Sequence, residues 1–194
     1  MCNACTQCCK LLSTGQRHCP FYIRPAYGFD GRQTDRNRFT LSLETGGLVQ
    51  FRYTDGGFSY GGGGALRILP GYGFGRVSLL GGLELSGGAM VKAKDTSTFV
   101  LNYFPAVPVV VRLRGTMWHA DIEAAAVTLL QADNSNVSYG GRLGFGVGIS
   151  ALRTRFIIPW AGVGIAYEYF AESGGRSAAS FYRGGFRIGF QWAP

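Results

Sequence analysis

The stretch Ser138–Leu152, "SYGGRLGFGVGISAL", alternates between two kinds of residue. Its odd positions are mostly apolar: Tyr139, Gly141, Leu143, Phe145, Val147, Ile149 and Ala151. Its even positions are small or charged: Gly140, Arg142, Gly144, Gly146, Gly148 and Ser150. Successive side chains of a β-strand point to opposite faces of a sheet. The stretch therefore predicts a strand with one apolar face and one glycine-rich face that carries an arginine.

The same period recurs along most of the chain. Apolar faces are expected from Leu66 to Phe74, from Val77 to Val91, at Val111 and Leu113, and from Phe186 to Trp192. Glycine interrupts most windows in which a helical period of 3.6 could be sought. The predicted strands are residues 20–30, 38–54, 58–75, 77–93, 97–104, 108–118, 138–153, 155–170 and 179–192.

Two of these assignments stay open. Residues 38–54 can be one strand or a hairpin broken at "ETGG", and residues 119–137 fit a strand, a short helix or a long loop. Elsewhere the turns agree with the period, because Phe74 and Val77 flank a two-residue turn and both belong to apolar faces. Eight to ten strands are expected.

The composition favours closely packed strands. Of 194 residues 31 are glycine, 14% are aromatic and only 15% are charged, against roughly 25% charged in soluble domains. The net charge of +8 comes mostly from arginines that occur singly inside apolar runs, so a nucleic-acid partner is not expected. No apolar run reaches 18 residues, and "CCKLLS" is too short for the core of a secretory signal. For an exported protein, the signal is expected upstream of Met1 or already removed.

The polar faces indicate which side of the sheet is inside. A soluble barrel exposes Lys, Glu, Thr and Ser, whereas here the polar faces hold glycine with isolated arginines and glutamates. Such faces fit the lumen of a small membrane barrel, where arginine can pair with buried carboxylates. The expected inward arginines are Arg24, Arg52, Arg67, Arg112, Arg114, Arg142, Arg183 and Arg187, and their expected partners are Glu44, Glu84 and Glu168. The predicted fold is an all-β, antiparallel, up-and-down transmembrane β-barrel with a polar Arg/Glu-lined lumen.

A family resemblance lies in the last third of the chain. The "GGRLGFGVG…PWAGVGIAYEYF" hairpin and the terminal aromatic strand resemble bacterial outer-membrane barrels, of the autotransporter-translocator or OmpA-like small type. The resemblance covers about residues 138–192, and the chain departs from it by adding Ala193 and Pro194 after Trp192. It implies location in the outer membrane, with membrane lipid and the barrel assembly machinery as partners. The sequence does not indicate an oligomeric state.

Three functions follow as alternatives. The first is a structural or surface barrel, or a narrow pore that favours anions because arginine exceeds acid on the polar faces. The second is a soluble lipocalin-like binder, which needs the apolar face inside. The third is a hydrolase using His119 with Asp121, which lie at alternate positions in "MWHADIE". No serine motif accompanies that pair, so an enzyme is not expected.

All five cysteines lie in the first nineteen residues, at Cys2, Cys5, Cys8, Cys9 and Cys19. The candidates for metal ligands are Cys2, Cys5, Cys8 and Cys19, but the spacing from Cys8 to Cys19 departs from ferredoxin-type runs. Disulfides and lipidation of Cys2 are further alternatives. The simplest interpretation is a cysteine-rich leader or tether over residues 1–19, outside a barrel of residues 20–194, with no cofactor.

Overall fold

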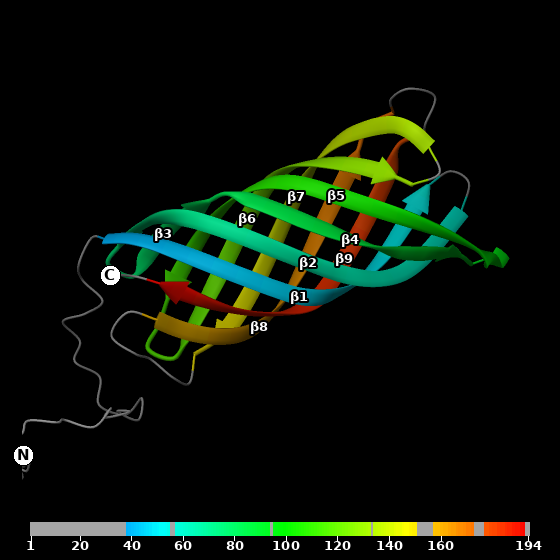
Figure 1. The fold of residues 1–194 in the computed structure, drawn as a ribbon. Helices are drawn as coiled ribbons and strands as arrows, with labels where there is room; N and C mark the ends of the chain where they lie inside the picture. The colour runs from blue at the N-terminus through cyan, green and yellow to red at the C-terminus, as the bar shows by residue number, and fades with distance from the viewer. Residues whose placement is uncertain are drawn as a thin grey trace, which may run out of the picture.

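The computed structural model describes residues 38–54, 57–93, 95–132, 134–150, 157–172 and 177–192. These residues form β-strands joined by short connections (Figure 1). The strands are β1 (Arg38–Thr54), β2 (Gly57–Phe74), β3 (Val77–Gly81), β4 (Leu83–Lys92), β5 (Asp95–Arg114), β6 (Trp118–Gln131), β7 (Asn134–Ile149), β8 (Ile157–Phe170) and β9 (Ala179–Trp192). No helix among the described residues is long and apolar enough to cross a membrane.

The sheet closes on itself, because β1 pairs with both β2 and β9. Every neighbouring pair is antiparallel. β3 and β4 occupy one position in the ring, since both pair with β2 on one side and with β5 on the other. The nine strands therefore make an eight-position, up-and-down barrel (Figure 1). The predicted fold class and the lower end of the predicted strand number are confirmed.

The interruption between β3 and β4 lies at Gly82, beside Pro108 of β5. The Gly82 amide donates to the Pro108 carbonyl at 3.2 Å. Proline has no amide proton, so it cannot return a hydrogen bond to its neighbour. The pairing register is the same on both sides of the break, from Gly81↔Val109 to Glu84↔Ala106. β3 and β4 thus run on in the same direction, and only one step of the hydrogen-bonded pairing is lost between them.

One expected division of strands differs from the structure, and two open assignments are settled by it. Residues 97–104 and 108–118 were expected as two strands, but β5 runs through Pro105 and Pro108 as one. The ambiguous residues 119–137 contain the strand β6 and the start of β7. Residues 38–54 are one strand, which settles the open alternative of a broken hairpin. The strand expected at 20–30 and the division at residue 19 lie outside the described residues.

The two ends of the barrel differ in their connections. At one end, here called the terminal end, β1 begins, β9 ends, and β2 meets β3 in a tight turn at Gly75–Arg76 (Figure 1). Gly75 has φ of 61°, in the left-handed region that favours glycine. The opposite end, here called the distal end, carries the connections from β1 to β2, β4 to β5, β6 to β7 and β8 to β9.

Glycines on the inner face allow the strands to approach one another closely. A Cβ added to Gly63 of β2 would lie 2.6 Å from Gly88 Cα of β4, closer than real Cβ atoms come. A Cβ on Gly162 of β8 would lie 2.8 Å from Gly148 Cα of β7. Other inward glycines make room for side chains, because a Cβ on Gly164 would collide with the Arg187 guanidinium. The glycine-rich inner face therefore leaves space for large arginines.

Candidate functional site: the charged lumen

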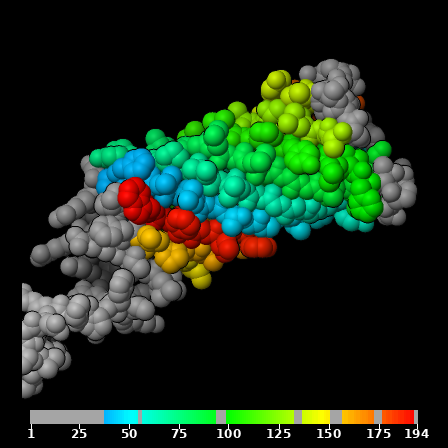
Figure 2. All heavy atoms as spheres, viewed as in Figure 1, coloured from blue at the N-terminus to red at the C-terminus, as the bar shows by residue number. Residues whose placement is uncertain are grey.

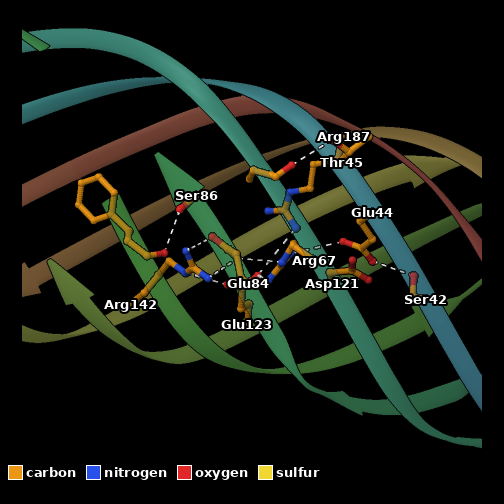
Figure 3. Close-up of polar contacts among 12 residues, drawn as sticks. Ser42, Glu44, Thr45, Arg67, Glu84, Ser86, Asp121, Glu123, Arg142 and Arg187 are labelled. Carbon is orange, nitrogen blue, oxygen red and sulfur yellow. Dashed lines mark hydrogen bonds and ion pairs between the residues drawn. The ribbon is translucent and has the colours of Figure 1, made fainter. Parts of the chain in front are cut away.

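Arg67 of β2 lies between two glutamates on the neighbouring strands. It is directly opposite Glu44 of β1 and opposite Glu84 of β4. Arg67 Nη1 is 3.4 Å from Glu44 Oε2, and Arg67 Nε is 2.9 Å from Glu84 Oε2. Its Nη2 pairs across the lumen with Glu123 of β6. One guanidinium thus joins carboxylates from three strands (Figure 3).

Arg112 of β5 is a second arginine that binds several acidic side chains. Its Nε and Nη2 donate to the two carboxylate oxygens of Asp121, each at 2.8 Å, and Nη2 also donates to Glu44 Oε1 at 2.8 Å. The guanidinium lies 5.0 Å from the centre of the Trp160 ring. This is the bidentate geometry in which an arginine–carboxylate pair is strongest.

Arg142 of β7 is a third arginine that binds several acidic side chains. Its two terminal nitrogens donate to the oxygens of Glu84 at 2.7 and 2.6 Å. Its Nε lies 2.8 Å from Glu123 Oε1, and its Nη1 lies 3.2 Å from Glu168 Oε1 of β8. Glu84 and Glu123 therefore link Arg142 to Arg67, so the ion pairs of these arginines form one connected network (Figure 3).

Two arginines of β9 complete the network with fewer contacts. Arg183 Nε is 3.2 Å from Glu168 Oε2, and its guanidinium carbon lies 3.7 Å from the centre of the Phe104 ring. Arg187 Nη1 lies 3.8 Å from Glu123 Oε2. The side chain of Arg187 is 22% exposed, whereas Arg67, Arg112 and Arg142 are buried.

The network is electrically balanced. It joins five arginines to five acids: Arg67, Arg112, Arg142, Arg183 and Arg187 with Glu44, Glu84, Asp121, Glu123 and Glu168. Buried ions are stable only when both signs are present, and the loss of one partner leaves an uncompensated charge. The arrangement therefore holds the strands together as a unit.

The sequence-predicted lumen residues do not all lie in this network. It contains Arg67, Glu84, Arg112, Arg142, Glu168 and Arg187, and also Glu44 and Arg183. Arg114 lies nearer the terminal end and donates to Ser78. Arg52 lies nearer the distal end, 5.6 Å from the Phe181 ring centre. Arg24 is outside the described residues.

Two members of the network were not expected as ion-pair partners. Asp121 and Glu123 point inward from β6 and contact Arg112, Arg67 and Arg142. The alternate spacing of Asp121 and Glu123 is typical of residues on one face of a strand, but residues 119–137 were not assigned to a strand.

The contacts of His119 are those of a packed structural residue. It is buried, and its ring packs edge-on against Trp160 with 4.6 Å between the ring centres. His119 Nε2 is 3.9 Å from Asp121 Oδ2, and Arg112 already binds both oxygens of Asp121. A histidine that activates water needs a carboxylate free to orient it and a nucleophile within reach. The geometry does not favour the hydrolase.

No group of three His, Cys, Asp or Glu side chains among the described residues could hold a metal ion. The candidate ligands Cys2, Cys5, Cys8 and Cys19 lie outside the part of the chain that the structure describes.

The lumen is apolar nearer the distal end. Phe104, Phe170 and Phe181 point inward and are almost fully buried, with ring centres 5.3 to 6.2 Å apart. Met90, Val127 and Leu129 pack in the same cluster. A smaller inward cluster, Leu69, Leu80 and Val110, lies nearer the terminal end. The expected Arg/Glu lining therefore occupies the middle of the lumen, and apolar side chains fill the lumen on both sides of the charged network.

The outer wall is apolar. Leu66, Leu83, Leu85, Leu143 and Ile165 are each more than half exposed. The space-filling view shows side chains forming a continuous wall on the face that carries β9, β1, β2 and β5 (Figure 2). The lipocalin-like alternative is not favoured, because it requires these residues to face inward.

Aromatic side chains gather on the outer wall towards each end. Near the distal end, Tyr53 packs against Phe58 and Tyr182, with ring centres 5.1 and 5.7 Å apart. Near the terminal end, Phe39 meets Trp192 at 6.3 Å. Tyr60 and Tyr72 of β2 are twelve residues apart, which is roughly 28 Å along the normal for a strand tilted by about 45°.

An antiparallel barrel with this apolar band, two aromatic belts and inward charges belongs to the class of transmembrane β-barrels. Closure also satisfies the backbone groups that an open sheet would leave unpaired in lipid.

The chain is similar in fold to solved structures of small barrels. Neisserial surface protein A is 14% identical, with 81% of this chain and 99% of that chain covered and a TM-score of 0.49. Ail of Yersinia pestis, in a complex with the heparin analogue sucrose octasulfate, is 13% identical, with 80% and 99% covered and a TM-score of 0.43. The N-terminal β-barrel domain of Pseudomonas aeruginosa OprF is 15% identical, with 81% and 100% covered and a TM-score of 0.40.

None of the three is described as an autotransporter translocator. No protein-family model matches the chain, and no curated protein sequence matches it.

Proposed function

We propose that this chain is a bacterial outer-membrane β-barrel that serves as a structural or surface barrel with a closed lumen. The observation that carries the proposal is the placement of side chains on the two faces of the wall. Apolar residues such as Leu85 and Leu143 face outward, while Arg67 and Arg142 are buried inside. In water this arrangement would expose the apolar wall, whereas in a membrane the wall meets lipid.

The lumen is filled rather than open. Eight strand positions leave an interior that side chains can just fill. Here the Phe104, Phe170 and Phe181 rings occupy it nearer the distal end, and the ion-pair network crosses it in the middle. The arginine excess that suggested an anion-selective pore disappears within the network, because its charges balance. A structural role for the barrel is thus favoured over the conduction of anions through its lumen.

Cell fractionation with heat treatment tests the membrane proposal. The protein is expected in the outer-membrane fraction, to require detergent for extraction, and to change its gel mobility between unboiled and boiled samples. Recovery in the aqueous fraction without detergent would contradict membrane insertion. In planar bilayers, the purified barrel is expected to give no stepwise openings, and reproducible steps would contradict the closed lumen.

Two partners follow from the proposed location. Outer-membrane lipid would cover the apolar wall between the aromatic belts. The barrel assembly machinery would take the chain through β9, whose outward face holds Phe186, Ile188, Phe190 and Trp192. Replacing Phe190 and Trp192 by serine would then lower the amount of heat-modifiable barrel in cells, while the same change at Phe39 and Phe74 on other strands would lower it less.

A further inference from the structure

The charged lumen contains an unfilled space. A cavity of about 60 Å³ lies against Arg67, Arg142, Arg183 and Arg187, with Glu44, Glu84 and Glu123 also in its lining. Its remaining walls are largely glycine and alanine, including Gly46, Gly164 and Gly185. A space of this size holds more than one water or one small inorganic ion.

Two arginines at this cavity have unused donor capacity. Arg183 is buried, and its Nη2 has no hydrogen-bond partner among the described residues. Its Nη1 donates to Ser86 Oγ at 3.0 Å, and its Nε faces Glu168. A buried guanidinium nitrogen without a partner carries a desolvation cost that a ligand can offset.

Arg187 is the least neutralised member of the network. Its carboxylate partner is Glu123, at 3.8 Å, and Glu123 already binds Arg67 and Arg142. The partial exposure of Arg187 places it against open space rather than packed side chains. Its long side chain is accommodated by Gly164, where any Cβ would displace it.

The charge around the cavity has the sign that attracts an anion. Four arginines line it against three glutamates. A low-dielectric wall surrounds these charges, so the interaction with an ion inside is stronger than in water.

We propose that this cavity is a binding site for one small inorganic anion, of the size of a halide, held by Arg183 and Arg187. The apolar clusters at either side of the network slow its exchange with solvent. The ion is a resident of a closed lumen, not a permeating one. The site depends on the barrel fold but not on the proposed location in the outer membrane.

Bromide is the probe, because it scatters anomalously and is small enough for the cavity. The refolded full-length chain is heated in detergent with sodium bromide or sodium gluconate at equal ionic strength. Gluconate is a bulky organic anion and serves as the comparison salt. The unfolding temperature is expected to rise with bromide concentration and not with gluconate, and crystals soaked in bromide should show an anomalous peak within hydrogen-bond distance of Arg183 or Arg187.

Matched variants separate the site from a general salt effect. Arg187→Gln is expected to weaken bromide binding by about tenfold or more, which is the value of one charge-assisted hydrogen bond. Arg76→Gln removes the same charge from the exposed β2–β3 turn and should keep the bromide response. Glu123→Gln removes the competing carboxylate and should strengthen the response, which keeps the test decisive if Arg187→Gln does not fold.

An unfolding temperature that is identical in the two salts would overturn the site. An unchanged response in Arg187→Gln, or in Glu123→Gln where Arg187→Gln fails to fold, would also overturn it. A barrel that remains heat-modifiable but binds no bromide would leave the proposed function standing.

Discussion

Arg112 and Asp121 lie directly opposite each other on β5 and β6, and two guanidinium nitrogens meet the two carboxylate oxygens at 2.8 Å. Only the turn at residues 115–117 separates their strands, so the pair forms between neighbours in sequence. The same guanidinium also binds Glu44 on the far strand β1, at 2.8 Å. A local pair is thereby tied to a contact that exists only after the barrel has closed.

The first prediction concerns this arginine. Arg112→Met removes the positive charge and leaves Asp121 and Glu44 in the lumen with less compensation. Breaking a buried ion pair from one side costs about 3–5 kcal/mol, so the free energy of unfolding should fall by that amount. Urea unfolding in detergent, followed by tryptophan fluorescence, measures it. Arg76→Met, in an exposed turn, is the control and should change stability by less than about 0.5 kcal/mol.

The second prediction uses the depth of outward residues in the membrane. Leu85 lies at mid-height of the wall and is 58% exposed, while Phe74 lies at the end of β2. Leu85→Arg should cost about 2–4 kcal/mol when the barrel folds into lipid vesicles, and Phe74→Arg about 0–1 kcal/mol. Equal costs at the two positions would contradict an apolar band between the aromatic belts.

The period of two could predict which residues face inward, because it is a property of the strand itself. Arg142 and Phe145 are assigned to opposite faces by spacing alone, and the structure places them so. Partners across the lumen depend instead on which strands close the ring. The contact between Arg67 and Glu123 joins residues 56 positions apart, and no local pattern specifies it.

In strand β5 apolar and polar residues do not alternate. Val100, Phe104 and Val110 point inward, yet Leu101, Tyr103 and Val109 point outward, so both faces are apolar. Without alternation the prolines at 105 and 108 resembled strand breaks. In the barrel they interrupt single hydrogen bonds, and the strand continues past them. The aromatic cluster around Phe104 was missed for the same reason.

The third prediction tests that cluster. Phe104 is fully buried against Phe170 and Phe181, and the Arg183 guanidinium lies over its ring. Phe104→Ala removes these contacts and leaves a cavity inside the barrel, which should lower the free energy of unfolding by about 3–5 kcal/mol. Phe104→Leu refills part of the volume and should recover about half of the loss. If both variants unfold like the wild type, the rings do not pack as the structure shows.

The fourth prediction compares two adjacent glycines on β2. Gly63 faces the lumen, and a Cβ there would lie 2.6 Å from Gly88 Cα and closer still to the carbonyl oxygen of Gly87. Gly64 faces outward, and the nearest atom to its Cβ would be the Gly46 carbonyl oxygen at 3.4 Å. Overpacking costs about 1–3 kcal/mol, so Gly63→Ala should destabilise the barrel by that amount, whereas Gly64→Ala should leave the unfolding midpoint nearly unchanged. Both variants lose the same backbone entropy in the unfolded state, so the difference between them reports the contact between β2 and β4. Equal midpoints would mean that the two strands can separate to admit a methyl group.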